Sequence, residues 1–159
     1  MKAFIYVTII LFAGCATSYQ ENGFTGGFNE TQLSENMWQV SFSGNGFTGS
    51  KRVADFALLR AAEISEQNGF EYFGILSNEK DVSVQEYQTE SRSTTTGSAQ
   101  SFGNRYNYNE QTTTKGPETY YVSKPSNNIT IRCFKDNPNG LSLYNVKIVK
   151  NSIKKKYGI

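Results

Sequence analysis

The stretch SKRVADFALLRAAEISEQNG, residues 50–69, decides the fold, because it holds the strongest helical pattern of the 159-residue chain. Its apolar residues recur at spacings of three and four, which is the period of an α-helix. The pattern includes Val53, Phe56, Ala57, Ala61 and Ile64. Thr48 or Ser50 is expected to cap the start of this helix, and Asn68-Gly69 is expected to end it. The sequence therefore predicts an amphipathic helix with one buried face.

The segment before this helix has the period of a strand. Trp38, Val40 and Phe42 alternate with polar residues, a pattern typical of a half-buried strand. A shorter strand over residues 28–32 is expected to pair with it through the turn-forming residues 33–36. These features predict a hairpin in front of the helix.

Four further strand patterns follow the helix, over residues 70–77, 81–89, 118–125 and 127–135. The first is rich in aromatic residues and is expected to be largely buried. In the last, alternate residues place Ile129, Ile131 and Cys133 on one face, where Cys133 is expected to act as a small buried apolar residue.

The C-terminal segment, residues 141–159, fits two structures. Val146 and Ile148 would suit a strand, whereas Val146, Val149, Ile153 and Tyr157 would share one face of a helix. The run Lys154, Lys155 and Lys156 followed by Gly158 is typical of a helix C-terminus. The helix is the preferred interpretation.

Residues 90–116 differ in composition from the rest of the chain, because Ser, Thr, Asn, Gln and Gly dominate them. Such a segment has no core of its own. Two Thr-Thr-Thr runs, at 94–96 and 112–114, lie symmetrically about Asn104, and Gly103-Asn104 suits a two-residue turn. The segment is therefore either disordered or a twisted hairpin, and Tyr106 and Tyr108 could contact a partner in either case.

Taken together, these patterns predict a single α+β domain over residues 28–159 that contains the polar insertion 90–116. A small antiparallel sheet would pack on one long amphipathic helix, and a shorter C-terminal helix would complete the domain.

The first 15 residues have the features of an export signal. Lys2 precedes an apolar run of eleven residues, 3–13, which is shorter than the roughly 20 that a membrane span requires. The run ends in Leu-Phe-Ala-Gly-Cys, residues 11–15, which resembles the lipobox of bacterial lipoproteins. We expect residues 1–14 to be a signal peptide that is cut between Gly14 and Cys15, with Cys15 then acylated. The alternative is an ordinary signal peptide in which Cys15 is incidental.

A lipidated Cys15 would place the protein on a membrane. Several acyl chains anchor firmly, since each buried methylene contributes about 0.8 kcal/mol. Residues 15–27 are small and polar, and are expected to form a tether between the membrane and the domain. Cys133 is the only other cysteine, so it has no partner for an internal disulfide.

Charge is distributed unevenly along the chain. Residues 16–116 contain 7 Lys/Arg and 12 Asp/Glu, whereas residues 117–159 contain 8 and 2. The basic C-terminal segment offers a candidate contact for anionic glycolipid or phosphate headgroups through Lys147, Lys150, Lys154, Lys155 and Lys156. An exposed helix end explains the same lysines without a ligand. No nucleic-acid partner is expected for an exported protein with this charge balance.

The sequence predicts no catalytic, cofactor-binding or metal-binding residues. The chain has no histidine, which excludes histidine triads and the commonest metal ligand. It has no phosphate-binding loop, dinucleotide fingerprint or nucleophile elbow. Paired carboxylates would be the only route to an enzyme, and their positions suit solvated helix faces and strand ends. We therefore expect a protein without catalytic activity.

Four sequence blocks resemble a family of small, uncharacterised lipoproteins of Gram-negative bacteria. The blocks are Thr-Gly-Gly-Phe at 25–28, Trp-x-Val-x-Phe-x-Gly-Asn at 38–45, Arg-Val-x-Asp-Phe-x-Leu-Leu-Arg-x-Ala-Glu at 52–63 and Gly-Phe-x-Tyr-Phe at 69–73. The resemblance implies a lipid-anchored envelope protein with a structural or interaction role, and implies no activity. Ala16 after the acylated cysteine would direct sorting to the outer membrane, where the domain would face the periplasm and contact an envelope protein or the cell wall.

The sequence Asn-Gly-Phe-Thr-Gly occurs twice, at 22–26 and 45–49. The residues that follow the two copies differ, so a structural repeat is not expected. We expect two turns that share turn-forming residues, with Thr48 in the second copy helping to start the helix.

Overall fold

A computed structural model describes residues 16–137 and 140–159, and these residues form two compact units. The core unit contains the described residues up to Ser83 together with Ser123–Ile159, and the hairpin unit contains Val84–Val122. The single domain predicted for residues 28–159 is therefore divided. The hairpin unit begins before and ends after the polar insertion predicted at 90–116.

The predicted α+β class is confirmed, with a mostly antiparallel sheet and two helices. The main sheet is larger than the small sheet predicted. It has five strands, in the order β1-β2-β6-β3-β7. Its strands are β1 (Gly27–Ser34), β2 (Met37–Ser43), β6 (Thr119–Phe134), β3 (Tyr72–Gln88) and β7 (Tyr144–Asn145). The predicted N-terminal hairpin is β1–β2, in which Gly27 pairs with Ser43 and Gln32 with Trp38.

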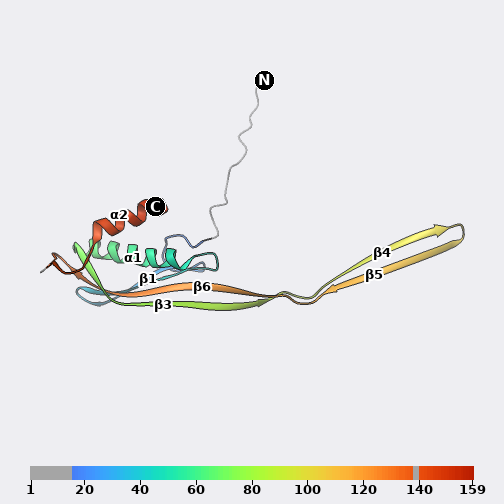
Figure 1. Cartoon of the computed structure of the whole chain (residues 1–159), viewed down its shortest axis with the longest axis horizontal. Helices are drawn as coiled ribbons and strands as arrows, with labels where there is room; N and C mark the ends of the chain where they lie inside the picture. Colours follow the sequence, from blue (N-terminus) through green and yellow to red (C-terminus); the bar gives the residue numbers. More distant parts are fainter. Residues whose placement is uncertain (1–15, 138–139) are drawn as a thin grey trace, which may run out of the picture. The chain divides into compact units, whose positions relative to one another are not determined.

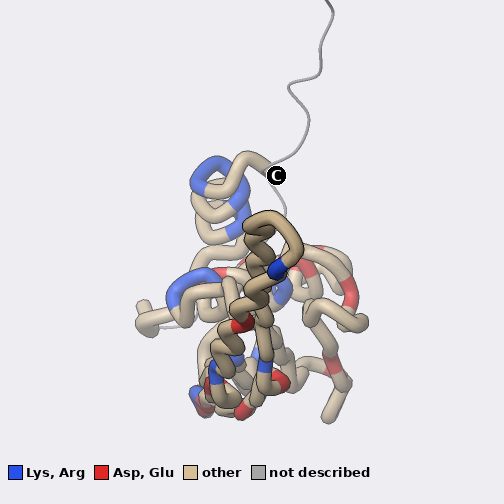
Figure 2. The backbone as a smooth tube through the Cα atoms, turned by 90° about the vertical axis from the view of Figure 1, so that its right-hand side faces the viewer, with Lys and Arg blue, Asp and Glu red and all other residues tan. Residues whose placement is uncertain are grey.

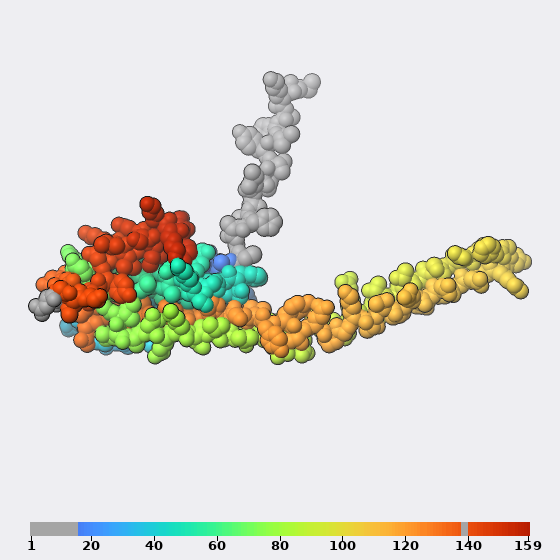
Figure 3. Space-filling view, viewed as in Figure 1, coloured from blue at the N-terminus to red at the C-terminus, as the bar shows by residue number. Residues whose placement is uncertain are grey.

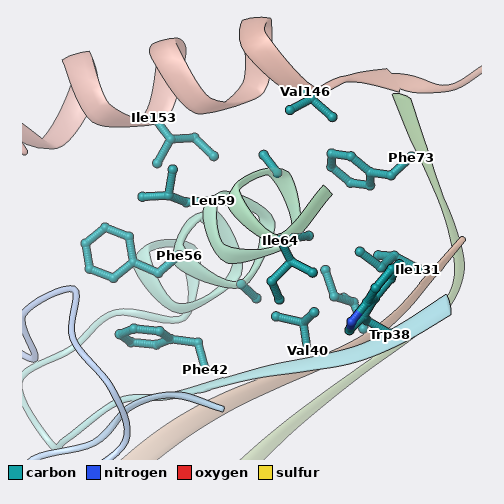
Figure 4. Close-up of a cluster of buried hydrophobic side chains, with 14 of the residues drawn as sticks. Trp38, Val40, Phe42, Phe56, Leu59, Ile64, Phe73, Ile131, Val146 and Ile153 are labelled. Carbon is teal, nitrogen blue, oxygen red and sulfur yellow. The ribbon is translucent and has the colours of Figure 1, made fainter. Parts of the chain in front are cut away.

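Alternate residues of β2 and β6 form the floor of the core. Trp38, Val40 and Phe42 are buried, as are Ile129 and the other inward residues of β6, including Cys133. Both strands are antiparallel and in register, so their inward side chains lie on the same face of the sheet. Figure 4 shows Val40 and Phe42 rising from the sheet toward the helix above it.

That helix is α1 (Ser50–Gln67), and the second helix is α2 (Val146–Tyr157). Figure 1 shows α1 lying between the sheet and α2 within the core unit. The apolar pattern of the sequence is realised, because Val53, Phe56 and Ile64 are all buried. Leu59 and Ala62, which widen the apolar face, are buried as well.

The helix ends differ in how well they were predicted. Gly49 is the N-cap of α1 and has no side chain to bond, so the predicted cap at Thr48 or Ser50 is wrong. Asn68 and Gly69 end the helix as predicted. In α2, the Asn145 side chain accepts a hydrogen bond from the Ile148 backbone nitrogen at 3.1 Å. Gly158 ends α2 in the left-handed conformation, which confirms the preferred helix.

The strands beyond α1 are longer than the sequence indicated. The predicted segments 70–77 and 81–89 are one strand, β3, and 118–125 and 127–135 are one strand, β6. β3 and β6 are neighbours in the sheet, and the hydrogen bonds between them extend each strand through its polar residues. Only Phe73 of β3 is fully buried, so the expectation of a largely buried strand is also wrong.

The hairpin unit contains the two-stranded sheet of β4 (Arg92–Phe102) and β5 (Arg105–Lys115). Its turn is Gly103-Asn104, and the Thr-Thr-Thr runs face each other, with Thr94 paired to Thr113 and Thr95 to Thr112. Of the two alternatives for residues 90–116, the structure has the hairpin. Every residue of β4 and β5 is exposed (Figure 3, yellow to orange).

Candidate functional site

The first described residues are part of the folded domain. Thr17 is buried, and the Tyr19 ring packs against Phe28 and Phe56 at centroid distances of 5.0 and 5.3 Å. The prediction of a tether over residues 15–27 is therefore wrong from Thr17 onward. The polar composition of this segment was misleading, because Thr17 is buried with its polar atoms hydrogen bonded.

The two Asn-Gly-Phe-Thr-Gly copies form turns in different registers. In the first copy, Gly23 and Gly26 exchange backbone hydrogen bonds of 3.2 and 3.1 Å, so Phe24 and Thr25 form the tip. In the second, the Thr48 nitrogen donates to the Asn45 carbonyl at 3.0 Å, which places Gly46 and Phe47 at the tip. The two copies are turns and not a structural repeat, as expected, but different residues of the shared sequence form the two tips.

Thr17 joins these two turns. Its hydroxyl donates to the Thr25 carbonyl at 2.7 Å and accepts from the Asn45 backbone nitrogen at 2.9 Å. Its backbone nitrogen donates to the Thr48 hydroxyl at 2.8 Å. The Thr48 side chain, expected at the helix cap, instead binds Thr17. We call Thr17 and the turns 22–26 and 45–49 the turn junction.

Close packing fixes the first turn against the sheet. Gly26 has φ +94°, and a Cβ there would lie 2.2 Å from the Ser43 carbonyl oxygen. Any other residue would therefore force the first turn away from β2 and from Thr17. The turn junction is a defined structure and not a loose connection.

Thr17→Val is expected to lower the free energy of unfolding by about 2–3 kcal/mol, because it keeps the shape but removes the buried hydroxyl that donates to the Thr25 carbonyl and accepts from the Asn45 nitrogen. Urea unfolding of the purified protein measures this change. Thr17→Ser is the matched control, since it retains the hydroxyl and should cost about 1 kcal/mol or less. Equal losses in the two variants would contradict the role assigned to the hydroxyl.

A polar network extends from this segment across the helices. The Tyr19 hydroxyl donates to Glu63 Oε2 at 2.5 Å, and Arg60 binds Glu30 through its Nε and Nη2 atoms at 3.1 and 2.6 Å. Lys154 also contacts Glu63, at 2.9 Å. Burial, reinforced by the bond to Glu63, raises the pKa of Tyr19, and the bond to Glu30 raises the pKa of Arg60. The network joins the N-terminal segment, β1, α1 and α2.

Three of the five lysines proposed as anion contacts are paired with carboxylates of α1. Lys150 contacts Glu66 at 2.5 Å, Lys154 contacts Glu63, and Lys156 bonds Asp55. Figure 2 shows the basic residues gathered on α2, next to the C-terminus. The uneven charge of the sequence is thus used in part within the fold, because lysines of the basic helix α2 pair with carboxylates of α1.

The other two lysines do not form a positive pocket with these three. Lys147 lines a small depression together with Glu66 and Glu71, whose carboxylates disfavour an anion there. Lys155 is exposed on α2. The structure thus does not gather the predicted lysines into one site.

The two tyrosines of the predicted partner contact are both exposed on β5. Tyr106 has 80% of its surface accessible. Tyr108 lies across the strand pair, because a Cβ on Gly97 would lie 2.7 Å from the Tyr108 hydroxyl. This glycine makes room for the ring, which covers the backbone of β4. Both tyrosines remain available to a partner.

The described residues show no arrangement typical of a reactive centre. Cys133 is buried beside Ser65, with their Sγ and Oγ atoms 3.2 Å apart, and burial raises the pKa of its thiol. Within residues 16–137 and 140–159, no group of three or more acidic, cysteine or histidine residues could hold a metal ion. None of the described helices is long and apolar enough to cross a membrane.

The predicted signal peptide lies outside the described residues, as do the predicted cleavage site between Gly14 and Cys15 and the predicted lipidation site Cys15. Comparison with protein-family models, with curated proteins and with solved structures finds no match to the chain. The resemblance to Gram-negative lipoproteins therefore remains a prediction from the sequence blocks.

Three residues of the turn junction were not predicted from the sequence as functional residues: Thr17, Phe24 and Phe47. Phe24 is fully exposed and Phe47 is 74% exposed, each at the tip of its turn. The repeated sequence could have indicated Phe24 and Phe47, because both copies carry the aromatic residue at the same position.

Proposed function

We propose that this chain is a lipoprotein of the bacterial cell envelope, anchored by acyl chains on Cys15 and serving an interaction role without catalysis. The observation that carries the proposal is the sequence Leu-Phe-Ala-Gly-Cys at 11–15, placed two residues before the first buried residue of the domain, Thr17. Ala16 favours outer-membrane sorting, so the domain would face the periplasm.

The hairpin unit supports the interaction role. An isolated two-stranded hairpin is marginally stable in water, because it has little apolar surface to bury. β4 and β5 are exposed along their whole length, and each has a strand edge without a neighbour among the described strands. Such edges can accept a further strand from a partner, and exposed tyrosines favour contact surfaces. An envelope protein or the cell-wall polymer is the partner class this unit would contact.

Removing the hairpin unit is expected to remove the partners and leave the core unit folded. Ser83 and Lys124 lie side by side in the core unit, since the Ser83 hydroxyl donates to the Lys124 carbonyl at 3.3 Å. An Asn-Gly turn can therefore connect Ser83 to Ser123 in place of residues 84–122. Crosslinking in intact cells, followed by capture of the acylated protein, should lose specific partners in this variant.

A matched variant tests the tyrosines separately. Tyr106→Ser with Tyr108→Ser keeps the strands and should weaken partner capture by about tenfold or more, as loss of interface tyrosines commonly does. Trp38 fluorescence checks that the core unit of each variant is intact, because this residue is buried in the core. An unchanged set of crosslinked partners after deletion of residues 84–122 would reject the hairpin as the contact element.

A further inference from the structure

We propose that the turn junction is a membrane-insertion site, in which Phe24 and Phe47 enter the interfacial layer of the lipid bilayer that holds the acylated Cys15. The inference rests on the proposed lipidation and assigns a further role to residues of the folded domain. The membrane would contact the protein at two exposed aromatic side chains as well as at the lipid anchor.

Only a short length of chain separates the anchor from the domain. Acyl chains lie in the hydrocarbon, so the acylated cysteine must lie at the boundary between hydrocarbon and headgroups. Two residues span at most about 7 Å between the Cα atoms of Cys15 and Thr17. The headgroup layer of one leaflet is about 5–7 Å thick. Thr17 must therefore lie within that layer or directly against it.

Thr17 cannot approach the membrane alone. One hydroxyl group holds both turns, through the 2.7 Å bond to the Thr25 carbonyl and the 2.9 Å bond from the Asn45 nitrogen. The tip residues adjoin residues that are bonded to Thr17. Phe24 precedes Thr25, and Phe47 precedes Thr48, whose hydroxyl accepts from the Thr17 backbone nitrogen at 2.8 Å. Whatever brings Thr17 to the headgroups also brings both turns.

The composition of the two turns suits the membrane interface. Residues 22–27 and 44–49 contain no charged side chain, so no charge has to leave water when they enter the interface. The flanking charges are Glu21 and Lys51, one of each sign. Two phenylalanine rings exposed to water in neighbouring turns are unfavourable in a free domain, whereas the interfacial layer accepts such rings.

Fluorescence quenching by lipids brominated near the headgroups tests the proposal. Phe24→Trp and Phe47→Trp are made in the full, acylated protein, which is reconstituted into phosphatidylethanolamine–phosphatidylglycerol vesicles. The emission of each new tryptophan is expected to shift to shorter wavelength and to lose most of its intensity. The natural Trp38 is the only tryptophan of the chain and is 4% exposed, so it provides an internal reference that stays unquenched.

Leu33→Trp is the matched control. Leu33 is half exposed but lies at the far end of β1 from Gly27 and the first turn, so a tryptophan there is expected to remain unquenched. Unquenched emission at positions 24 or 47 in vesicle-bound, acylated protein would overturn the insertion site and leave the lipid anchor standing. Equal quenching at position 33 would overturn it as well, because the contact would not be specific to the turns.

Mass spectrometry of the reconstituted protein separates this failure from failure of the proposed function. An acylated mass together with quenching at both positions supports the insertion site. A mass without acyl chains would reject the lipoprotein and the insertion site together, because the distance argument depends on the anchor.

Discussion

Phe56→Ala is expected to lower the free energy of unfolding by about 3–5 kcal/mol, the largest loss for any single residue considered. The Phe56 ring is fully buried at the centre of the core unit. It makes edge contacts with Phe42 from the sheet and Tyr157 from α2, at centroid distances of 5.0 and 4.9 Å. It also contacts Tyr19 of the N-terminal segment. Removing it leaves a cavity where four parts of the fold meet.

Urea unfolding followed by Trp38 fluorescence measures the loss, because this residue is buried in the same core. Phe102→Ala is the chemically matched control, since Phe102 is exposed in the hairpin unit and its removal should change stability by less than about 0.5 kcal/mol. A loss below about 1 kcal/mol for Phe56→Ala would contradict its central position, because such cavities normally cost several times more.

Cys15→Ser is expected to abolish acylation completely, which is the largest effect expected on function. In the proposed anchor the Cys15 thiol carries the lipid, which a serine hydroxyl cannot replace, and the proposed cut before residue 15 depends on the modified cysteine. Growth with a radiolabelled or alkyne-bearing fatty acid should label the wild-type protein and leave the variant unlabelled. The variant should also remain larger, because it keeps residues 1–14.

Cys133→Ser supplies the control for this experiment. Cys133 is the only other cysteine and is buried in the core, so its replacement should leave the label in place. Label that persists in Cys15→Ser and disappears in Cys133→Ser would place the lipid on the wrong residue for the proposed anchor.

The elements that the sequence predicted correctly are those whose apolar residues have a clear period. The α1 helix, the β1–β2 hairpin and the inward face of β6 each follow from a repeat of 3.6 or 2 residues. The helix over 146–157 followed from its lysines and from Gly158. The two threonine runs and Gly103-Asn104 indicated a hairpin as one of two alternatives for residues 90–116, and Thr94 pairs with Thr113 rather than with Thr114.

The remaining features depend on contacts between distant residues. Thr17 is buried because Thr25, Asn45 and Thr48 satisfy its polar atoms, and residues 16–27 show no apolar period. The strands β3 and β6 are long because each pairs with the other, which composition does not reveal. The lysines of α2 looked available to a ligand because their α1 carboxylates lie about a hundred residues away in the chain, as for Lys156 and Asp55.

The central claim is that Cys15 carries the lipid that attaches this domain to a membrane. Mass spectrometry of the N-terminal peptide, taken from the protein purified out of its native membranes, tests it most directly. The predicted result is a chain that begins at Cys15 and carries acyl chains on that residue. A peptide that contains residue 15 as an unmodified cysteine, or a chain cut at another position, would contradict the claim.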